Sequence, residues 1–193
     1  MSLRNTYYGL RHGESEANVQ GLIACDPETA LKGFGLSERG RTQVQASAAA
    51  QALALAGAKV VTSDFARARQ TAEIAAHVLG VEPPRTDLRL RERWFGELEG
   101  EPATRYAEVW ALDREDPTHT EFGVEAATAV VARLSSLIRE LEEAHEGQTV
   151  LLVSHGDPLQ LLGTALGGRS PGVHRELAPW QPGEVRRLEG ALP

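Results

Sequence analysis

Apolar and polar positions alternate in blocks along this chain, and the blocks predict strands that alternate with helices. Several short runs of β-branched and other apolar residues end directly in a polar or glycine-containing segment, which is typical of buried strands in a parallel sheet. The predicted strands are Thr6–Leu10, Lys59–Thr62, Leu88–Leu90, Thr149–Val153 and Glu184–Leu188.

Between these runs, apolar residues recur every three or four positions, which indicates helices. Ser37 is the expected N-cap of the first helix, which ends at Gly57. Asn18–Gly35 is predicted to be a loop that is too long for a simple connection, and Arg91–Gly100 to be irregular. Pro117 separates two of the later helices. The other predicted helices are Ala66–Leu79, Glu101–Asp116, Glu121–Glu146 and Pro158–Leu166.

Strands that alternate with helices imply a largely parallel sheet covered on both faces. We therefore predict an α/β fold, a three-layer α/β/α sandwich with a mostly parallel sheet. At 193 residues the chain is long enough to bury one substantial core, and we expect a single domain over residues 1–193.

Composition and charge narrow the function classes. The net charge of −7 argues against general nucleic-acid binding. No apolar run approaches the roughly 18 residues that a membrane-spanning helix needs, and the first residues lack the apolar region of a signal peptide. The one cysteine, Cys25, cannot form an internal disulfide or a thiolate metal cluster. We expect a cytoplasmic protein that binds neither nucleic acid nor membrane.

Two histidine-glycine pairs carry the first candidate chemistry. Arg11-His12-Gly13 follows the first predicted strand, and Ser154-His155-Gly156 follows the strand Thr149–Val153. Carboxyl ends of parallel strands meet at one edge of a sheet, where α/β proteins place their sites. A glycine has no Cβ, so a ligand or a second side chain can come close to the backbone there. The sequence therefore predicts one site built from both ends of the chain.

A third strand end adds a cation to this expected site. The run Lys59–Thr62 leads into Ser63–Arg67, which places Arg67 in the first turn of the next helix. The positive end of a helix dipole and a guanidinium group both favour a bound phosphate. Arg11, His12, Arg67 and His155 would then form one cluster of cationic or proton-donating groups, as an anion site requires.

Other polar features indicate no site. Gly33-Phe34-Gly35 with Gly40 has the wrong spacing for a dinucleotide-binding loop. Four histidines lack the spacing of metal ligands and are predicted at the surface or at helix ends. Three tryptophans are predicted to pack internally, and four arginines to form a solvated face. These residues are His77, His119, His145, His174, Trp94, Trp110, Trp180, Arg85, Arg89, Arg91 and Arg93.

In the order of its motifs, the chain resembles the histidine phosphatase (phosphoglycerate mutase-like) superfamily over nearly its whole length. A single motif of this kind arises easily by chance, whereas five in the same order do not. The five segments are Arg11–Ser15 with Asn18, Gly35–Gly40, Ser63–Ala72, Leu90–Glu92 followed by Gly96 and Glu99-Gly100, and Ser154–Gly156.

The resemblance implies a covalent mechanism. His12 would attack phosphorus as a neutral imidazole and form a phosphohistidine, with its other ring nitrogen donating to a backbone carbonyl. Arg11, Arg67 and a protonated His155 would bind the phosphate oxygens. Glu92 would protonate the leaving alcohol and then activate water, a role that needs a raised pKa.

Two more residues are implied as substrate contacts, namely Asn18 and Gly156. No metal and no organic cofactor is expected. The implied ligand is a small phosphorylated substrate, and we allow for a homodimer.

Three functions remain open on the sequence. The mutases of the family are usually longer and carry a tryptophan after the first motif, whereas Asn18–Ile23 has none, so we favour a metal-independent, acid-type phosphatase. The alternatives are a cofactor-dependent phosphoglycerate mutase and a module that binds a phosphorylated ligand without turnover. Gly123–Ala126 departs from the family's usual Gly-Glu-Ser, so substrate contacts from residues 101–126 are left open.

Overall fold

The computed structural model describes residues 2–192. Its centre is a five-stranded sheet with the order β3-β2-β4-β1-β5, in which β5 runs antiparallel to β1 and the other pairs are parallel. The predicted α/β fold with a mostly parallel sheet is confirmed. The strands are β1 (Thr6–Arg11), β2 (Lys59–Thr62), β3 (Arg85–Thr86), β4 (Thr149–Ser154) and β5 (Val185–Leu188).

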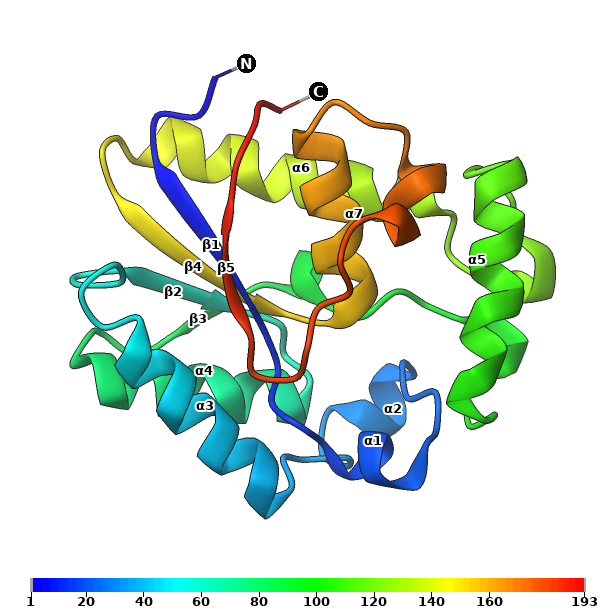
Figure 1. Ribbon diagram of the computed structural model, residues 1–193, viewed down its shortest axis with the longest axis horizontal. Helices are drawn as coiled ribbons and strands as arrows, with labels where there is room; N and C mark the ends of the chain where they lie inside the picture. Colours follow the sequence, from blue (N-terminus) through cyan, green and yellow to red (C-terminus); the bar gives the residue numbers. More distant parts are fainter. Residues whose placement is uncertain (1, 193) are drawn as a thin grey trace.

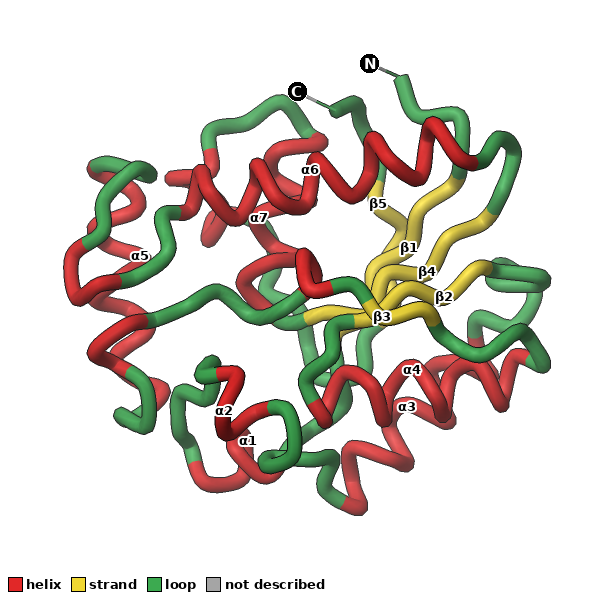
Figure 2. The backbone as a smooth tube through the Cα atoms, turned by 180° about the vertical axis from the view of Figure 1, so that it is seen from behind, coloured by secondary structure: helices red, strands yellow, loops and turns green. Residues whose placement is uncertain are grey.

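Helices cover both faces of this sheet, as the predicted three layers require. Figures 1 and 2 show α3 and α4 on one face and α6 and α7 on the other, while α1, α2 and α5 lie beyond the carboxyl ends of the parallel strands. The helices are α1 (Glu16–Gln20), α2 (Pro27–Ala30), α3 (Glu38–Ala50), α4 (Ala66–Leu79), α5 (Tyr106–Glu115), α6 (Ala127–Ala144) and α7 (Gly156–Leu166). Short 3₁₀ turns are η1 (Leu88–Leu90), η2 (Gly96–Leu98), η3 (Ala103–Arg105), η4 (Glu121–Gly123) and η5 (Pro171–Glu176).

The central strand β4 divides the core into two layers because its side chains alternate between the faces. Leu151 and Val153 pack with apolar residues of α3 and α4. Val150 and Leu152 pack with those of α6 and α7. All four side chains are fully buried, which explains why this strand reads as a continuous apolar run.

Five predicted elements differ from the structure. Leu88–Leu90 forms the 3₁₀ turn η1 rather than a strand, because Asp87 accepts a hydrogen bond from Arg89 N and caps the turn. The segment predicted to be a long loop contains α1 and α2. The helix predicted from Glu121 begins only at Ala127, since positive φ angles at Phe122 and Gly123 interrupt it. The first long helix ends at Ala50, ahead of Gly57, and α5 begins after η3.

The loop after β1 is fixed by backbone packed on backbone. A Cβ on Gly13 would come within 2.5 Å of Gly40 O, and a Cβ on Gly40 would overlap Glu14 O. Gly13 N also donates to Thr71 Oγ1 in α4. The close approach expected at Gly13 is therefore made by the first turn of α3.

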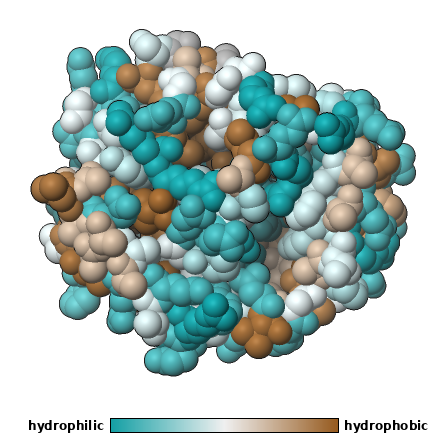
Figure 3. Space-filling model, viewed as in Figure 1, coloured by the Kyte–Doolittle hydropathy of each residue, from teal (hydrophilic) through white to brown (hydrophobic). Residues whose placement is uncertain are grey.

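In the view of Figure 3, hydrophilic side chains cover most of the molecular face, and apolar side chains lie in small separate groups. The large apolar residues that are exposed are scattered along the chain and include Leu53 and Leu88. Within residues 2–192, no helix has the length and apolar character that crossing a bilayer would require.

Candidate active site

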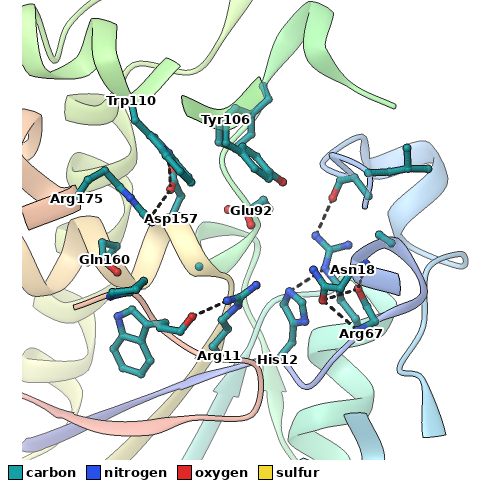
Figure 4. Close-up of a pocket in the computed structure, with 18 residues that line it drawn as sticks. Arg11, His12, Asn18, Arg67, Glu92, Tyr106, Trp110, Asp157, Gln160 and Arg175 are labelled. Atoms are coloured by element: carbon teal, nitrogen blue, oxygen red, sulfur yellow. Dashed lines mark hydrogen bonds and ion pairs between the residues drawn. The ribbon is translucent and has the colours of Figure 1, made fainter. Parts of the chain in front are cut away.

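A cavity of about 150 Å³ lies at the carboxyl ends of β1 and β2 and at the start of α7. Figure 4 shows side chains from segments far apart in the sequence converging on it. Six of the seven residues predicted for the site line this cavity: Arg11, His12, Asn18, Arg67, Glu92 and Gly156.

The parallel pairing of β1 with β4 brings the two histidine-glycine pairs together. Arg11 pairs with Ser154 in the sheet register, and His12 N donates to Ser154 O at 3.0 Å. The residue directly after each of these two strands is a histidine, and the ring centroids of His12 and His155 lie 5.1 Å apart. The two histidine-glycine pairs, which lie far apart in the sequence, are thus brought together at one edge of the sheet.

Two hydrogen bonds dictate the tautomer of His12. Nδ1 lies 2.7 Å from Gly13 O, which can only accept, so Nδ1 carries the proton. Nε2 accepts from Arg67 Nε at 3.2 Å, so Nε2 holds the lone pair. Burial lowers the pKa of His12 well below its usual value, and the charges of Arg67 and Arg11 lower it further. His12 is therefore neutral, with the carbonyl contact that the sequence predicted.

The two arginines keep buried donors without a partner among the described residues. Arg67 Nη2 donates to Ala24 O at 2.7 Å, but its Nη1 has no partner. Arg11 Nη1 donates to Trp180 O at 2.5 Å, but its Nε has none. An unsatisfied buried donor costs about 1–3 kcal/mol, so both groups favour an anion with several acceptor oxygens in the cavity.

Two helices begin beside these arginines. α4 follows β2 and α7 follows β4, and their N-cap residues Phe65 and His155 make no side-chain capping bond. The first N–H groups of each helix therefore remain open to another acceptor, and the positive ends of both dipoles add to the arginine charges. This combination is typical of phosphate sites.

His155 lies behind the cavity rather than in its wall. Its ring is fully buried, Nε2 is 3.0 Å from Ser63 Oγ, and Nδ1 has no partner among residues 2–192. Burial lowers the pKa of His155 well below its usual value, and Arg67 and His12 lower it further. Without a bound anion the neutral form of the His155 ring is therefore favoured, and the protonated form implied by the resemblance concerns the phosphate-bound site.

Glu92 has the raised pKa that a general acid needs. Burial and the nearby charge of Asp157 raise the pKa of Glu92 to about 7, against the lowering effect of Arg67. Glu92 Oε1 accepts from Arg93 N at 2.9 Å, which orients the carboxyl group. Near neutral pH this carboxyl group can both give and take a proton.

Asn18 reaches the cavity from α1, where it is exposed. Its Oδ1 accepts from Ser15 N and Ser15 Oγ in a capping box, each at 3.0 Å. The amide NH₂ group is the part of Asn18 that remains for a phosphate oxygen.

The far wall of the cavity was missed by sequence reasoning. Tyr106 and Trp110 come from α5, inside the stretch whose contacts were left open, and Trp110 was assigned to packing alone. Asp157 directly follows the second histidine-glycine pair, and this position was the only feature of the sequence that could have indicated a place in the site. Gln160 and Arg175 belong to no motif and could not have been found.

Two of the polar residues predicted at the surface or at helix ends, Arg93 and His174, are buried. Arg93 is fully buried and donates to both carboxylate oxygens of Asp113, at 2.6 and 2.8 Å. His119 Nε2 lies 2.9 Å from Asp113 Oδ1, and His174 is fully buried. The surface assignment of Arg93 is wrong, because its partner Asp113 lies 20 residues away in the sequence. His174 is buried but lies in the last turn of η5, and His119 is of intermediate exposure, so the helix-end alternative holds for His174. Trp94, assigned to packing, is exposed.

Comparison with known proteins places this geometry in a family. The model of the histidine phosphatase superfamily (branch 1) matches residues 7–191. Phosphoserine phosphatase 1 of Hydrogenobacter thermophilus is 34% identical over 169 residues, which cover 82% of this chain and 74% of that protein. A 2,3-bisphosphoglycerate-dependent phosphoglycerate mutase of Brucella anthropi is 31% identical over 177 residues, which cover 84% and 81%.

Solved structures agree with the sequence relatives. A mycobacterial glucosyl-3-phosphoglycerate phosphatase in complex with VO3 superposes with a TM-score of 0.81 at 28% identity, covering 94% of this chain and 90% of that one. The family match, the shared fold and the paired histidines all indicate the same assignment, and the chain belongs to the histidine phosphatase superfamily (branch 1).

Proposed function

We propose that this protein is a phosphatase that hydrolyses small phosphomonoesters through a phosphohistidine at His12. The observation that carries the proposal is the neutral His12, whose Nε2 lone pair lies beside two arginines with unpartnered buried donors. Relatives named as phosphoserine phosphatase and as adenosylcobalamin/α-ribazole phosphatase support this activity.

In the first step His12 Nε2 attacks phosphorus and the ester P–O bond breaks. The hydrogen bond from Arg67 to Nε2 must first be exchanged for one to a phosphate oxygen, which frees the lone pair. Protonated Glu92 gives its proton to the leaving oxygen, so the product is a neutral alcohol. Arg11 and Arg67 offset the phosphate charge throughout, which is the main protein contribution to phosphoryl transfer.

In the second step water attacks the phosphohistidine. The Glu92 carboxylate, left ionised by the first step, takes a proton from the water, and the electron pair of the N–P bond returns to His12 Nε2. Inorganic phosphate leaves, and both residues regain their starting protonation states.

His155 would join as phosphate arrives. A phosphate dianion favours the charged form of a nearby imidazole, so His155 would take up a proton on binding, while Ser63 Oγ accepts from its Nε2. With a proton on both Nδ1 and Nε2, the His155 ring would then add positive charge beside His12.

The relative named as a phosphoglycerate mutase supports a second candidate function, a mutase that would use the same His12. Incubation with 3-phosphoglycerate separates the candidates. Release of inorganic phosphate supports the phosphatase, whereas conversion to 2-phosphoglycerate in the presence of 2,3-bisphosphoglycerate supports the mutase. A non-catalytic binding module would bind the compound and produce neither.

Metal removal is expected to leave the activity unchanged. The guanidinium groups of Arg11 and Arg67 supply the positive charge that a divalent ion would otherwise provide. Among residues 2–192, no three His, Cys, Asp or Glu side chains are grouped to hold a metal ion. Hydrolysis of p-nitrophenyl phosphate should therefore survive excess EDTA. Loss of activity that magnesium restores would contradict this expectation.

The pH profile is expected to follow Glu92. Because its pKa is raised to about 7, the carboxyl group is protonated below that pH and can act as the acid. We expect kcat/KM for an alkyl phosphate to fall as the pH rises through about 7, while His12 stays neutral throughout. In Glu92→Gln this decrease in kcat/KM should be absent. Ionisation of the substrate affects both proteins equally, so the difference between their pH profiles reports on Glu92 alone. If kcat/KM of Glu92→Gln still decreased through this pH range, the decrease would have to come from another group.

A further inference from the structure

A third arginine lines the cavity, opposite the phosphate-binding pair. Arg175 belongs to η5, and its side chain is 32% exposed. Its ion pair with Asp157 spans 3.8 Å, too long for a hydrogen bond, and no hydrogen bond to its guanidinium group is found within residues 2–192. The five N–H donors of Arg175 are thus available to a ligand.

An aromatic stack holds this guanidinium group in place. Arg175 Cζ lies 3.8 Å from the centroid of the Trp110 ring, and Figure 4 shows Trp110 between Arg175 and Tyr106. The rings of Trp110 and Tyr106 stack at 5.5 Å with an angle of 9°. Asp157 Oδ1 accepts from Trp110 Nε1 at 3.0 Å and fixes the ring. A guanidinium group that stacks by its face presents its N–H edge to a ligand.

The backbone that carries Arg175 is held on both sides. Gln160 Nε2 donates to His174 O and Leu177 O, both at 2.9 Å. Gln160 belongs to α7, the helix that begins beside Arg11, so the two ends of the cavity share one rigid element. Arg175 therefore keeps a defined position relative to the phosphate-binding end.

Arg175 adds positive charge to a cavity that already contains Arg11 and Arg67. Burial lowers the pKa of Arg11, the charge of Glu92 raises it, and the charge of Arg175 lowers it. In the proposed mechanism, Arg11 and Arg67 already bind the phosphate group. A second anionic group on the substrate would use the third cation.

We propose that Arg175 binds a carboxylate on the leaving group, so that the substrates are short phosphorylated hydroxy acids. A planar carboxylate matches the two parallel donors at a guanidinium edge. Arg11, Arg67 and Arg175 line the same cavity, so a substrate that meets all three needs only a short carbon chain between its phosphate and its carboxylate. This inference rests on the proposed phosphatase activity and adds the substrate class to it.

Two substrates with one skeleton test the proposal. 3-Phosphoglycerate carries a carboxylate where glycerol 3-phosphate carries a hydroxymethyl group. We expect the wild-type protein to have at least about tenfold higher kcat/KM for 3-phosphoglycerate, the factor that one charge-assisted hydrogen bond supplies. In Arg175→Met this ratio should fall to near one, through loss of activity on 3-phosphoglycerate alone.

A matched arginine controls for net charge. Arg114 lies on α5 with its side chain 70% exposed, pairs with Glu176 and does not line the cavity. Arg114→Met should keep the wild-type ratio. Equal losses on both substrates in Arg175→Met, or a wild-type ratio near one, would overturn the role of Arg175. Hydrolysis of p-nitrophenyl phosphate reports separately on the proposed function, since its failure in the wild-type protein would overturn the phosphatase itself.

Discussion

His12→Ala is expected to retain less than about a thousandth of the wild-type turnover, because loss of a covalent nucleophile normally costs more than that. No other histidine lines the cavity within residues 2–192, so no neighbour can replace the phosphoryl carrier. The measurement is steady-state hydrolysis of p-nitrophenyl phosphate. Mass analysis of protein quenched under alkaline conditions should show one added phosphoryl group in the wild type and none in the variant.

Folding of the variant needs its own control, because the ring of His12 is 3% exposed and makes two hydrogen bonds. His12→Asn keeps a side-chain amide that can donate toward Gly13 O. Circular dichroism should show the wild-type spectrum for this variant. His77→Ala, on the exposed face of α4, should keep full activity. Turnover above a thousandth in a folded His12 variant would exclude covalent catalysis through His12.

Glu92→Gln is expected to cost about a hundredfold or more on an alkyl phosphate, in line with general acid catalysis. An alkoxide is a poor leaving group and needs the proton, whereas p-nitrophenolate leaves without one. On p-nitrophenyl phosphate the phosphohistidine should therefore form at nearly the wild-type rate in a single-turnover burst. Its hydrolysis should then be slow, because the carboxylate that activates water is missing.

The matched control for this variant is Glu97→Gln. Glu97 is exposed close to Glu92 in the sequence and does not line the cavity, so both substrates should be hydrolysed at wild-type rates. Equal losses of burst rate on the two substrates in Glu92→Gln would mean that Glu92 only shapes the cavity. The acid would then have to be another group.

The parts of the site that follow strand ends could be predicted, because their positions depend on local pattern and on the geometry of parallel sheets. His12 and His155 each end an apolar run, so a parallel sheet had to bring them to one edge. Arg67 follows in the same way from the end of β2. The raised pKa of Glu92 was predicted from the chemistry that it was expected to perform, and burial produces it.

The features of the site that could not be predicted from the sequence depend on contacts between distant segments. Arg93 reads as one of several charged residues in a polar stretch, yet Asp113 on α5 pairs with it in the interior. His174 is fully buried although its local sequence, Val173-His174-Arg175, shows no pattern that indicates burial. Trp110 and Arg175 meet only after α5 and η5 have packed together. Periodicity reports which face of an element is buried and does not identify the partner.

The pairing of β1 has a consequence for the way this protein reaches activity. β1 lies between β4 and β5, which are the last two strands in the chain, and the first of these pairings sets His12 beside His155. During synthesis β1, which leads to the proposed nucleophile His12, emerges well before β4 and β5 and has no sheet neighbour until these strands have been made. Contacts of such high sequence separation form slowly. A nascent chain therefore carries its proposed nucleophile without a complete site, and phosphoryl transfer through His12 would begin only when β1 and β4 have paired.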